Sequence, residues 1–536
     1  MHGETTFAIK GSGLKRREFL KFSVAAGAAL GAGALLGHPL VTEVLAQKKR
    51  EITIAISEEI ESLWPNAHIP TSPVPIVLDS IFDNLVYIGS CAQGAPKLAA
   101  GLAESWQFKG QEWLIKIRRG VKFHDGEELA AAAVVQSLNE ARDKKSRMSG
   151  SLVLIDTVEA VDDVTVRLVT KRPLAQQIWG LTWICMISPA ALQRYGAEIS
   201  KHAVGTGLFR QVEWIPGERL VVERVPDWWG FKVAGDLPFN KKNNIERITW
   251  RTIKEPVALL TALEAGEIDV AQYVLPHEVD RLRKKKDIQV AEVKHTRTGL
   301  LIMNQRIKPF DDVRVRQAIN YGVNWDLINK QLLQGKVDNS FGPLLPGQVG
   351  YDGTLQPYPY DPTKAKALLA AAGYAQKELE LEIFATRSAV ELKRVEICQA
   401  ISQQLKKIGI NLKVREVEYG FFLRGYFRNT LPFYIFAYTT YPDPWQYFLQ
   451  FIYSKGEGRT GYNNPKVDAL FEQAMGALDA EARGKLYKEA LAIAREDAVL
   501  VWRSALNDFR GTRSNLEYAP RCLDNYLRSH LLAMRT

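Results

Sequence analysis

The sequence predicts an α/β protein with more than one domain. Three observations lead to this prediction: a length of 536 residues, a first half rich in strand patterns, and a second half in which strand and helix patterns alternate. A single hydrophobic core rarely extends beyond about 250–300 residues, so we expect two or three packed units. Apolar residues make up 46% of the chain and charged residues 24%, which is the balance of an ordinary globular protein.

The first half carries several strand patterns. In Glu51–Ile56 the isoleucines occupy every second position, and this period places them on one face, so the segment is predicted to be a half-buried strand. Two hairpins are expected as well, because Lys109-Gly110 and Asp162-Asp163 separate pairs of alternating apolar runs. The hairpins are predicted over residues 105–118 and 158–169.

Strand and helix patterns alternate in the second half. A helix is predicted to begin at Asp361-Pro362, because Asp accepts bonds from unpaired amides and Pro suits the first helical position. Gly373 is expected to end it. There follow a strand over 378–383, a helix over 389–408 that stops at Gly409, and a strand near Leu412. This βαβ order predicts a partly parallel sheet.

The N-terminus has the features of an export signal. Arg16 and Arg17 form a twin-arginine block, and residues 22–37 carry no charge. Residues 1–46 are therefore predicted to be a twin-arginine signal peptide, with a retained membrane anchor as the alternative. The first cysteine is Cys91, so no lipid-anchor cysteine follows the apolar stretch. We expect a soluble protein of the periplasm.

Charge and cysteine usage narrow the choice of partners. The net charge is +10, but Lys and Arg are interspersed with Asp and Glu, and the densest basic run, 281–286, looks like a charged helix end. No nucleic-acid partner is expected, and a functional basic patch is the alternative. The four cysteines, Cys91, Cys185, Cys398 and Cys522, lack metal-ligand spacing. Cys398 lies on an apolar helix face, so a buried free thiol is predicted there.

Several sequence blocks resemble one family, the large solute-binding proteins of bacterial peptide, opine and nickel importers, called family 5. The order and spacing of these blocks are similar from the first strand to about Val501. The blocks are Leu102–Trp106 with Ile117–Gly126, Gly205–Gly207 with Asp227–Gly230, Leu263–Val270, and Asn304 with Pro309–Tyr321.

The resemblance implies a periplasmic-binding-protein-like α/β fold, with two lobes joined by a hinge and a small extra domain inserted in lobe one. The implied divisions are lobe one at 47–77, the inserted domain at 78–204, lobe one again at 205–293, lobe two at 294–501 and a return to lobe one at 502–536. The implied function is the substrate-binding subunit of an ABC importer. Such a subunit captures a short peptide or peptide-like solute by hinge closure and delivers it to a membrane permease, as a monomer, without a cofactor.

Catalysis is not expected. The sequence contains no HExxH, no GxSxG and no GxxxxGK[ST] pattern. His124-Asp125 is interpreted as a turn that closes a strand, and Gly126, Gly205 and Gly207 are predicted to occupy turns with positive φ. No metal site is predicted. A secreted hydrolase remains as a remote alternative.

The resemblance places ligand contacts in the second lobe. Arg387 lies near the arginine with which dipeptide-binding relatives hold the ligand carboxylate, and a solvated arginine is the alternative. Thr440 stands where peptide-binding members have an aspartate for the ligand ammonium, which leaves a non-peptide solute such as an opine, an oligosaccharide or a metal chelate as an alternative. Asp443 could supply that charge, or serve the structure. Tyr438 and Trp445 are candidate aromatic contacts, with core packing as the alternative.

Overall fold

A mixed sheet of eleven strands runs through the described part of the protein. This computed structural model describes residues 50–68, 74–89, 97–233, 239–339, 342–387, 393–439, 441–518, 520 and 527–535, so the predicted signal peptide lies outside it. The strand order is β15-β14-β16-β12-β17-β11-β1-β10-β9-β8, and β13 pairs with β17. In chain order these strands are β1 (Glu51–Ile56), β8 (Phe209–Ile215), β9 (Arg219–Arg224), β10 (Arg247–Thr252), β11 (Val270–Ala271), β12 (Ile288–Met303), β13 (Asp338–Asn339), β14 (Leu379–Ala385), β15 (Ile410–Glu416), β16 (Phe433–Thr439) and β17 (Leu500–Arg513).

The predicted first strand is confirmed as β1, at the centre of what we call the first lobe. Its isoleucines are buried, and it pairs in parallel with β10 and β11. Helices α3 (Val74–Leu78), α7 (Pro256–Ala265) and α8 (Val279–Leu282) belong to the same region. The charged run 281–286 begins in the last turn of α8, where Arg281 pairs with Glu264 at 2.7 Å.

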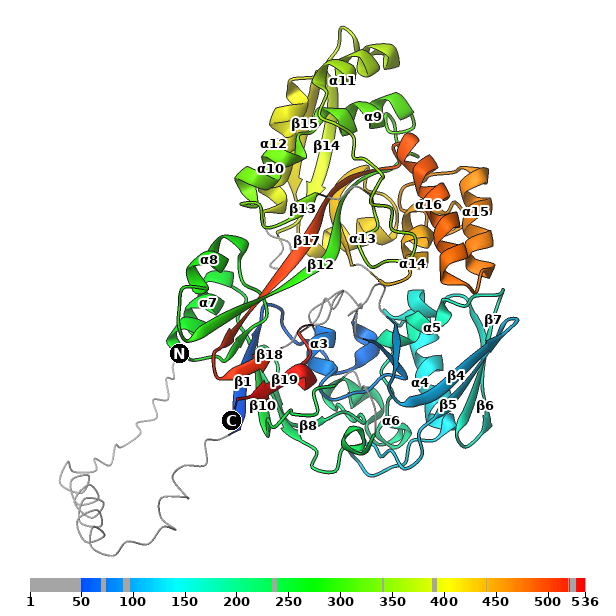
Figure 1. Cartoon of the computed structure of the whole chain (residues 1–536), viewed down its shortest axis with the longest axis vertical. Helices are drawn as coiled ribbons and strands as arrows, with labels where there is room; N and C mark the ends of the chain where they lie inside the picture. Colours follow the sequence, from blue (N-terminus) through cyan, green and yellow to red (C-terminus); the bar gives the residue numbers. More distant parts are fainter. Residues whose placement is uncertain are drawn as a thin grey trace, which may run out of the picture. The chain divides into compact units, whose positions relative to one another are not determined.

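Two long strands connect the first lobe to the second. β12 and β17 pair antiparallel, and Figure 1 shows them running side by side from the strands around β1 to those around β14. At one end β17 pairs with β11, and at the other β12 pairs with β16. The β12–β17 register shifts between Val293 and Arg297, and such a bulge locally weakens and bends a strand. The connection between the lobes is therefore irregular at this point.

The second lobe contains the predicted βαβ unit, because β14 and β15 are parallel and helix α12 lies between them. The Asp361 side chain caps the preceding helix by accepting a bond from the amide of Lys364 at 2.8 Å, and Gly409 adopts φ 92° after α12. The helices are α9 (Val313–Gly322), α10 (Trp325–Leu332), α11 (Pro362–Leu369), α12 (Arg394–Lys406), α13 (Tyr419–Phe427), α14 (Trp445–Tyr447), α15 (Pro465–Gly476) and α16 (Ala480–Glu496).

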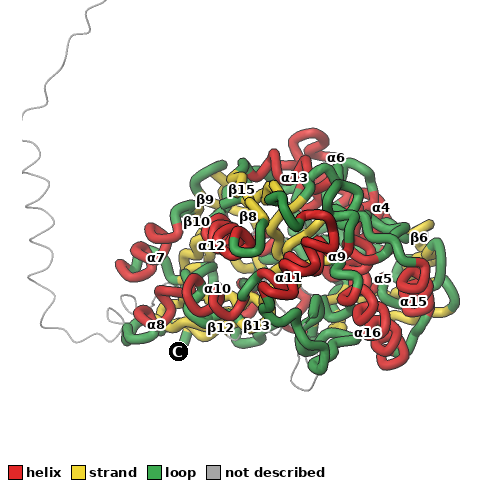
Figure 2. Tube along the Cα trace, turned by 90° about the horizontal axis from the view of Figure 1, so that it is seen from above, coloured by secondary structure: helices red, strands yellow, loops and turns green. Residues whose placement is uncertain are grey.

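Two apolar clusters cover the two faces of this part of the sheet. Leu301 and Val501 pack in one cluster with α9 and α12, while Leu300 and Trp502 pack in the other with α15 and α16. The alternation follows from the period of two in β12 and β17. Seen from above, α15 and α16 lie to one side of α9, α11 and α12 (Figure 2). Cys398 is a buried free thiol in the first cluster, as predicted.

A separate four-stranded sheet, β4-β5-β7-β6, lies within the range predicted for the inserted domain, and we call residues 78–204 the inserted segment. Both predicted hairpins are confirmed, and Gly110 turns the first with φ 64°. Its strands and helices are β2 (Val86–Ile88), β3 (Leu98–Ala100), β4 (Ala103–Lys109), β5 (Glu112–Ile117), α4 (Ala131–Arg142), β6 (Ile155–Asp162), β7 (Thr165–Thr170), α5 (Gln177–Gly180) and α6 (Pro189–Tyr195).

The prediction of a positive φ was wrong for two glycines, Gly205 and Gly207. Gly126 has φ 94°, as expected, but Gly205 and Gly207 do not have positive φ. They lie instead against the backbone of Ile81, where an added Cβ would come within 2.3 Å of its oxygen at Gly205 and 2.5 Å of its carbonyl carbon at Gly207. These positions need glycine because two backbones approach closely, not because of a left-handed turn.

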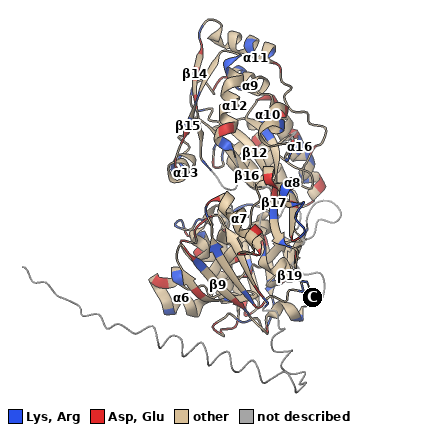
Figure 3. Cartoon of the chain, turned by 90° about the vertical axis from the view of Figure 1, so that its left-hand side faces the viewer, with Lys and Arg blue, Asp and Glu red and all other residues tan. Residues whose placement is uncertain are grey.

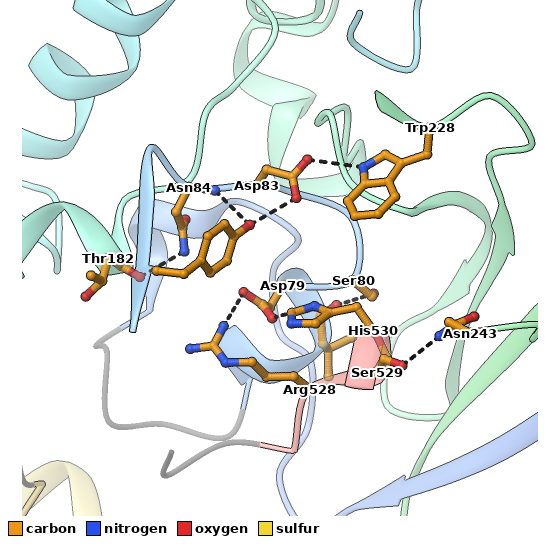
Figure 4. A network of polar contacts seen from close by, with 12 residues as sticks. Asp79, Ser80, Asp83, Asn84, Thr182, Trp228, Asn243, Arg528, Ser529 and His530 are labelled. Atoms are coloured by element: carbon orange, nitrogen blue, oxygen red, sulfur yellow. Dashed lines mark hydrogen bonds and ion pairs between the residues drawn. The ribbon is translucent and has the colours of Figure 1, made fainter. Parts of the chain in front are cut away.

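A buried polar network ties the C-terminal end of the chain to the inserted segment and to the first lobe (Figure 4). Arg528 pairs with Asp79 at 2.7 Å, and both side chains are nearly buried. Asn243 donates to the carbonyl of Ser529 at 3.1 Å. The network holds the short strands β18 (Leu516–Tyr518) and β19 (Leu532–Met534) against the first lobe. Cys91 and Cys522 lie outside the described residues.

Candidate functional site

The inserted segment reaches across to the second lobe. Leu174, in the loop between β7 and α5, is fully buried in an apolar cluster whose other buried members all lie within residues 300–502. Trp183 packs edge-to-face on Tyr441 with ring centroids 5.7 Å apart. The Arg172 guanidinium lies 5.8 Å from the centre of the Tyr453 ring. The two parts are therefore in contact near α5 (Figure 1).

A hollow of about 160 Å³ lies between the inserted segment and the second lobe. We call it the aromatic pocket. Tyr438 and Tyr441, which flank position 440, line it together with Tyr419 at the start of α13. The hydroxyl of Tyr438 is buried and has no hydrogen-bond partner among the described residues. Buried polar atoms are normally paired, so this hydroxyl is suited to bind a polar group of a ligand. Further lining residues include Arg147, Gly150, Ser151, Tyr426, Phe436, Thr439 and Gln450.

A second hollow, of about 420 Å³, lies between the first lobe and the second, and we call it the charged pocket. One wall is the start of α7 with Lys254, and the other is the start of α12 with Arg394. Leu275 and Val395 contribute apolar surface. Arg394 also lies close enough to Tyr419 for its charge to lower the pKa of that tyrosine, although burial has the larger, opposite effect. The charge of Arg394 in the charged pocket thus acts on Tyr419 in the aromatic pocket.

Arg387 is placed at the rim of the charged pocket. Its side chain is 70% exposed and forms a two-bond contact with Glu416, at 2.7 and 3.1 Å. This hydrogen bond raises the pKa of Arg387. A ligand carboxylate would have to displace Glu416 from the guanidinium. Exposed ion pairs contribute little free energy, so this exchange of partners is possible.

Asp443 and Trp445 are placed in the core. The Asp443 carboxylate is buried, accepts from Arg483 Nε at 2.7 Å and accepts from the Tyr487 hydroxyl at 3.1 Å. Burial raises the pKa of Asp443, and Arg483 counters this effect. Trp445 is 1% exposed and belongs to the apolar cluster of the second lobe. Both side chains contact protein in this structure. Thr440 lies outside the described residues.

Sequence reasoning missed Glu58, which follows the carboxyl end of β1. Burial raises the pKa of both Tyr273 and Tyr419, and the charge of Glu58 adds to this effect. One signal was present in the sequence. Ligands of α/β proteins bind outside the carboxyl ends of parallel strands, and β1 was predicted as a strand of such a protein.

A third hollow, of about 690 Å³, lies over the end of β5, the segment that follows it and residues 225–233. Six cations line it: Lys116, Arg118, Arg119, Lys122, Arg210 and Lys232. Basic residues therefore gather here more than the sequence indicated, although elsewhere on the chain both signs of charge are mixed (Figure 3). Arg118 lies over Trp229, 5.5 Å from the ring centre, and this hollow is lined by the first lobe and the inserted segment alone.

His124 and Asp125 lie in a turn, as predicted. His124 Nε2 bonds to the carbonyl of Gly207 at 2.9 Å, and burial lowers the pKa of this histidine to about 4. Asp125 accepts a bond from the hydroxyl of Ser188. Among the described residues no cluster of His, Cys, Asp and Glu side chains could hold a metal ion. The helices of the described ranges are all too short or too polar to cross a bilayer.

Comparison with known proteins identifies the family. Residues 97–459 match the family described as bacterial extracellular solute-binding proteins, family 5 Middle. The chain belongs to this family. It is the solute-binding subunit of an ABC importer, and proteins of this kind bind a small solute and deliver it to a membrane permease.

Relatives and solved structures agree with this assignment. The glutathione-binding protein GsiB of Pectobacterium atrosepticum is 31% identical over 428 residues, which cover 74% of this chain and 77% of GsiB. GsiB of Escherichia coli strain K12 is 28% identical over 412 residues, 74% of this chain and 78% of that protein.

Two solved structures share the two-lobe fold. The periplasmic binding protein DppA of Helicobacter pylori, in complex with the peptide STSA, gives a TM-score of 0.79 at 24% identity and covers 91% of this chain and 98% of DppA. NikZ of Campylobacter jejuni, in complex with Ni(L-His), gives 0.75 at 21% identity, covering 90% and 97%. The predicted fold class is confirmed.

Proposed function

We propose that this subunit captures a short peptide or peptide-like solute between its lobes and releases it unchanged to the permease. The observation that carries the proposal is the aromatic pocket, a hollow between the inserted segment and the second lobe that Tyr438 lines. The hydroxyl of Tyr438 is buried there and has no hydrogen-bond partner among the described residues. The similarity to glutathione-binding proteins supports a peptide-like ligand, because glutathione is a small tripeptide.

The ligand contacts follow from the sequence and the pockets together. Tyr438 would bond a polar group in the aromatic pocket, and Arg387, at the rim of the charged pocket, would hold a carboxylate. Contacts from Thr440, Asp443 and Trp445 remain predictions. Asp443 already has Arg483 as its counter-charge, so it would need to exchange that partner for a ligand ammonium.

Capture would proceed by closure of the lobes about β12 and β17. The contacts of Leu174 and Trp183 with the second lobe are those that closing forms and opening breaks. To raise a closed state from about 1% to about 99%, a ligand must bind it more tightly by about 5.5 kcal/mol. A few charge-assisted hydrogen bonds and stacked rings can supply this difference.

Location and domain limits complete the proposal. Residues 1–46 would direct twin-arginine export, and the mature protein would act as a periplasmic monomer without a cofactor or a nucleic-acid partner. Lobe one would comprise residues 47–77, 205–293 and 502–536, with the inserted domain at 78–204 and lobe two at 294–501.

A thermal-shift screen tests the ligand class. The panel would contain glutathione, di- to tetrapeptides, an opine, oligosaccharides and nickel–histidine. At 100 times its dissociation constant, a ligand stabilises the folded protein by about 2.7 kcal/mol. We expect stabilisation by peptide-like solutes and a smaller radius of gyration in X-ray scattering when they bind. Saturating binding without a change of radius would contradict closure, and release of an altered product would revive the hydrolase.

A non-peptide solute is the second candidate. Thr440 favours it, since threonine cannot neutralise a ligand ammonium. The structural similarity to NikZ, solved with Ni(L-His), is compatible with it. The same panel decides, because stabilisation by peptides alone would eliminate this candidate.

A further inference from the structure

The hollow of about 690 Å³ beside the end of β5, which we call the basic hollow, is separate from the space between the lobes. All its described lining residues belong to the first lobe and the inserted segment. Among them are six Lys and Arg side chains and two carboxylates, those of Glu104 and Asp227, which leaves an excess of four positive charges. His124 adds none at neutral pH, because burial lowers its pKa to about 4. A hollow lined by one sign of charge concentrates ions of the other sign, here anions.

Arg118 is held in position at the basic hollow. Its Nε donates to the carbonyl of Gly101 at 2.7 Å, and its guanidinium lies over the ring of Trp229, whose indole nitrogen donates in turn to Asp83 at 2.7 Å. Within the described chain, the two terminal nitrogens of Arg118, Nη1 and Nη2, have no hydrogen-bond or ion-pair partner. A guanidinium with both terminal nitrogens unpaired presents a fork that matches two oxygens of a phosphate group.

Four of the other cations are unpaired as well. Their side chains are exposed, and none forms an ion pair with a carboxylate of the described residues: Lys116, Arg119, Lys122 and Lys232. Arg210 differs, because it pairs with Glu223 at 2.7 Å. Five unpaired cations around one hollow repel one another, and a bound anion of several charges would remove this repulsion.

The segment 118–126, which supplies three of these cations, is anchored on two sides. The amide of Arg118 donates to the carbonyl of Leu102 at 2.9 Å, and the amide of His124 donates to the carbonyl of Gly205 at 2.9 Å. The arrangement of charges is therefore formed before any ligand binds, which lowers the entropic cost of binding.

We propose that the basic hollow binds an anion with two phosphate groups, independently of the solute held between the lobes. A phosphate monoester carries a charge of about −1.5 to −2 at pH 7, so two such groups match the excess of four positive charges. The volume lies within the range of about 300–1,000 Å³ that is usual for small-molecule sites. The phosphates can belong to a free molecule or to the head group of a lipid, and the chemistry of recognition is the same.

The test measures both sources in the absence of any transported solute. Titration calorimetry uses inorganic pyrophosphate as the free probe, with citrate as an anion of similar charge that lacks phosphate. Co-sedimentation uses phosphatidylcholine vesicles that contain cardiolipin, a lipid with two phosphates, or phosphatidylglycerol, a lipid with one, at equal total charge. We expect pyrophosphate to bind more tightly than citrate, or cardiolipin vesicles to bind more protein than phosphatidylglycerol vesicles.

Two variants locate the binding. Arg118→Gln removes the charge-assisted hydrogen bonds of the guanidinium and should weaken binding at least about 10-fold. Arg119→Gln combined with Lys122→Gln removes two exposed cations and should weaken it at least about threefold. This double variant leaves the anchoring bonds of the backbone intact, so it answers the question even if Arg118→Gln does not fold.

Lys109→Gln combined with Lys144→Gln is the matched control. Both lysines are exposed in the inserted segment and lie outside the basic hollow, so the net charge falls equally. Their distant charges are screened by salt, and binding should stay within about twofold of the wild type.

The outcomes separate the two sources and the possible failures. Binding of pyrophosphate that the hollow variants weaken indicates a free anion, and vesicle binding alone that they weaken indicates a lipid. The inference is overturned if neither probe binds, if the control variant loses as much affinity as the hollow variants, or if citrate and phosphatidylglycerol bind as well as their partners. Capture of a solute between the lobes stands or falls separately, because no solute is present in these measurements.

Discussion

Leu174→Ala should weaken ligand capture without a matching loss in the stability of the ligand-free protein. In the structure Leu174 is fully buried among side chains of the second lobe. The substitution removes three carbons from this contact, and at about 0.8 kcal/mol per buried methylene the closed state loses about 2.4 kcal/mol. A cavity that does not collapse would raise the loss to about 2.7–5 kcal/mol. In the open state, where Leu174 leaves the second lobe, little is lost.

The consequence is a shift of the closing equilibrium. A loss of about 2.4 kcal/mol reduces the closed population relative to the open one by about 50-fold. The apparent dissociation constant should rise by the same factor when the closed state is rare without ligand. Titration calorimetry with a solute from the panel measures it, and urea denaturation measures the stability of the ligand-free protein.

Leu138→Ala is the matched control for this substitution. Leu138 is also fully buried, but in α4 of the inserted segment, away from the second lobe cluster. The substitution should lower the free energy of unfolding, because it removes buried side-chain contacts. It should leave the dissociation constant within about threefold, because the open and closed states lose the same packing free energy. If Leu174→Ala instead lowers stability and leaves affinity unchanged, Leu174 stays buried in both states and does not report closure.

Three further substitutions test the structure. Arg483→Ala leaves the buried Asp443 carboxylate without its counter-charge and should cost about 3–5 kcal/mol in urea denaturation; a loss below 1 kcal/mol would contradict the ion pair. Gly207→Ala places a Cβ 2.5 Å from the carbonyl carbon of Ile81 and should cost about 1–3 kcal/mol; unchanged thermal unfolding would show that this backbone can move. Burial raises the pKa of Asp83 to about 7, so between pH 5 and 7 the folded state holds a proton that the unfolded state has lost. This group's contribution therefore falls by about 1.4 kcal/mol per pH unit as pH rises, and Asp83→Asn should lack that slope.

Local structure was predictable where one short segment decides it. The isoleucine alternation identified β1, and the Asp361 cap and Gly409 stop limited their helices, because each depends on residues a few positions apart. Gly205 and Gly207 show the limit of this reasoning. A glycine signals either a positive φ or a close approach, and only the position of Ile81, distant in the sequence, distinguishes the two.

The candidate site was harder to predict because its residues come from distant segments. Tyr438 was predicted and does line a pocket between the inserted segment and the second lobe. Asp443 was predicted as a possible counter-charge for the ligand, with a structural role as the alternative. It pairs with Arg483 on α16, and nothing in the sequence near Asp443 indicates that pairing.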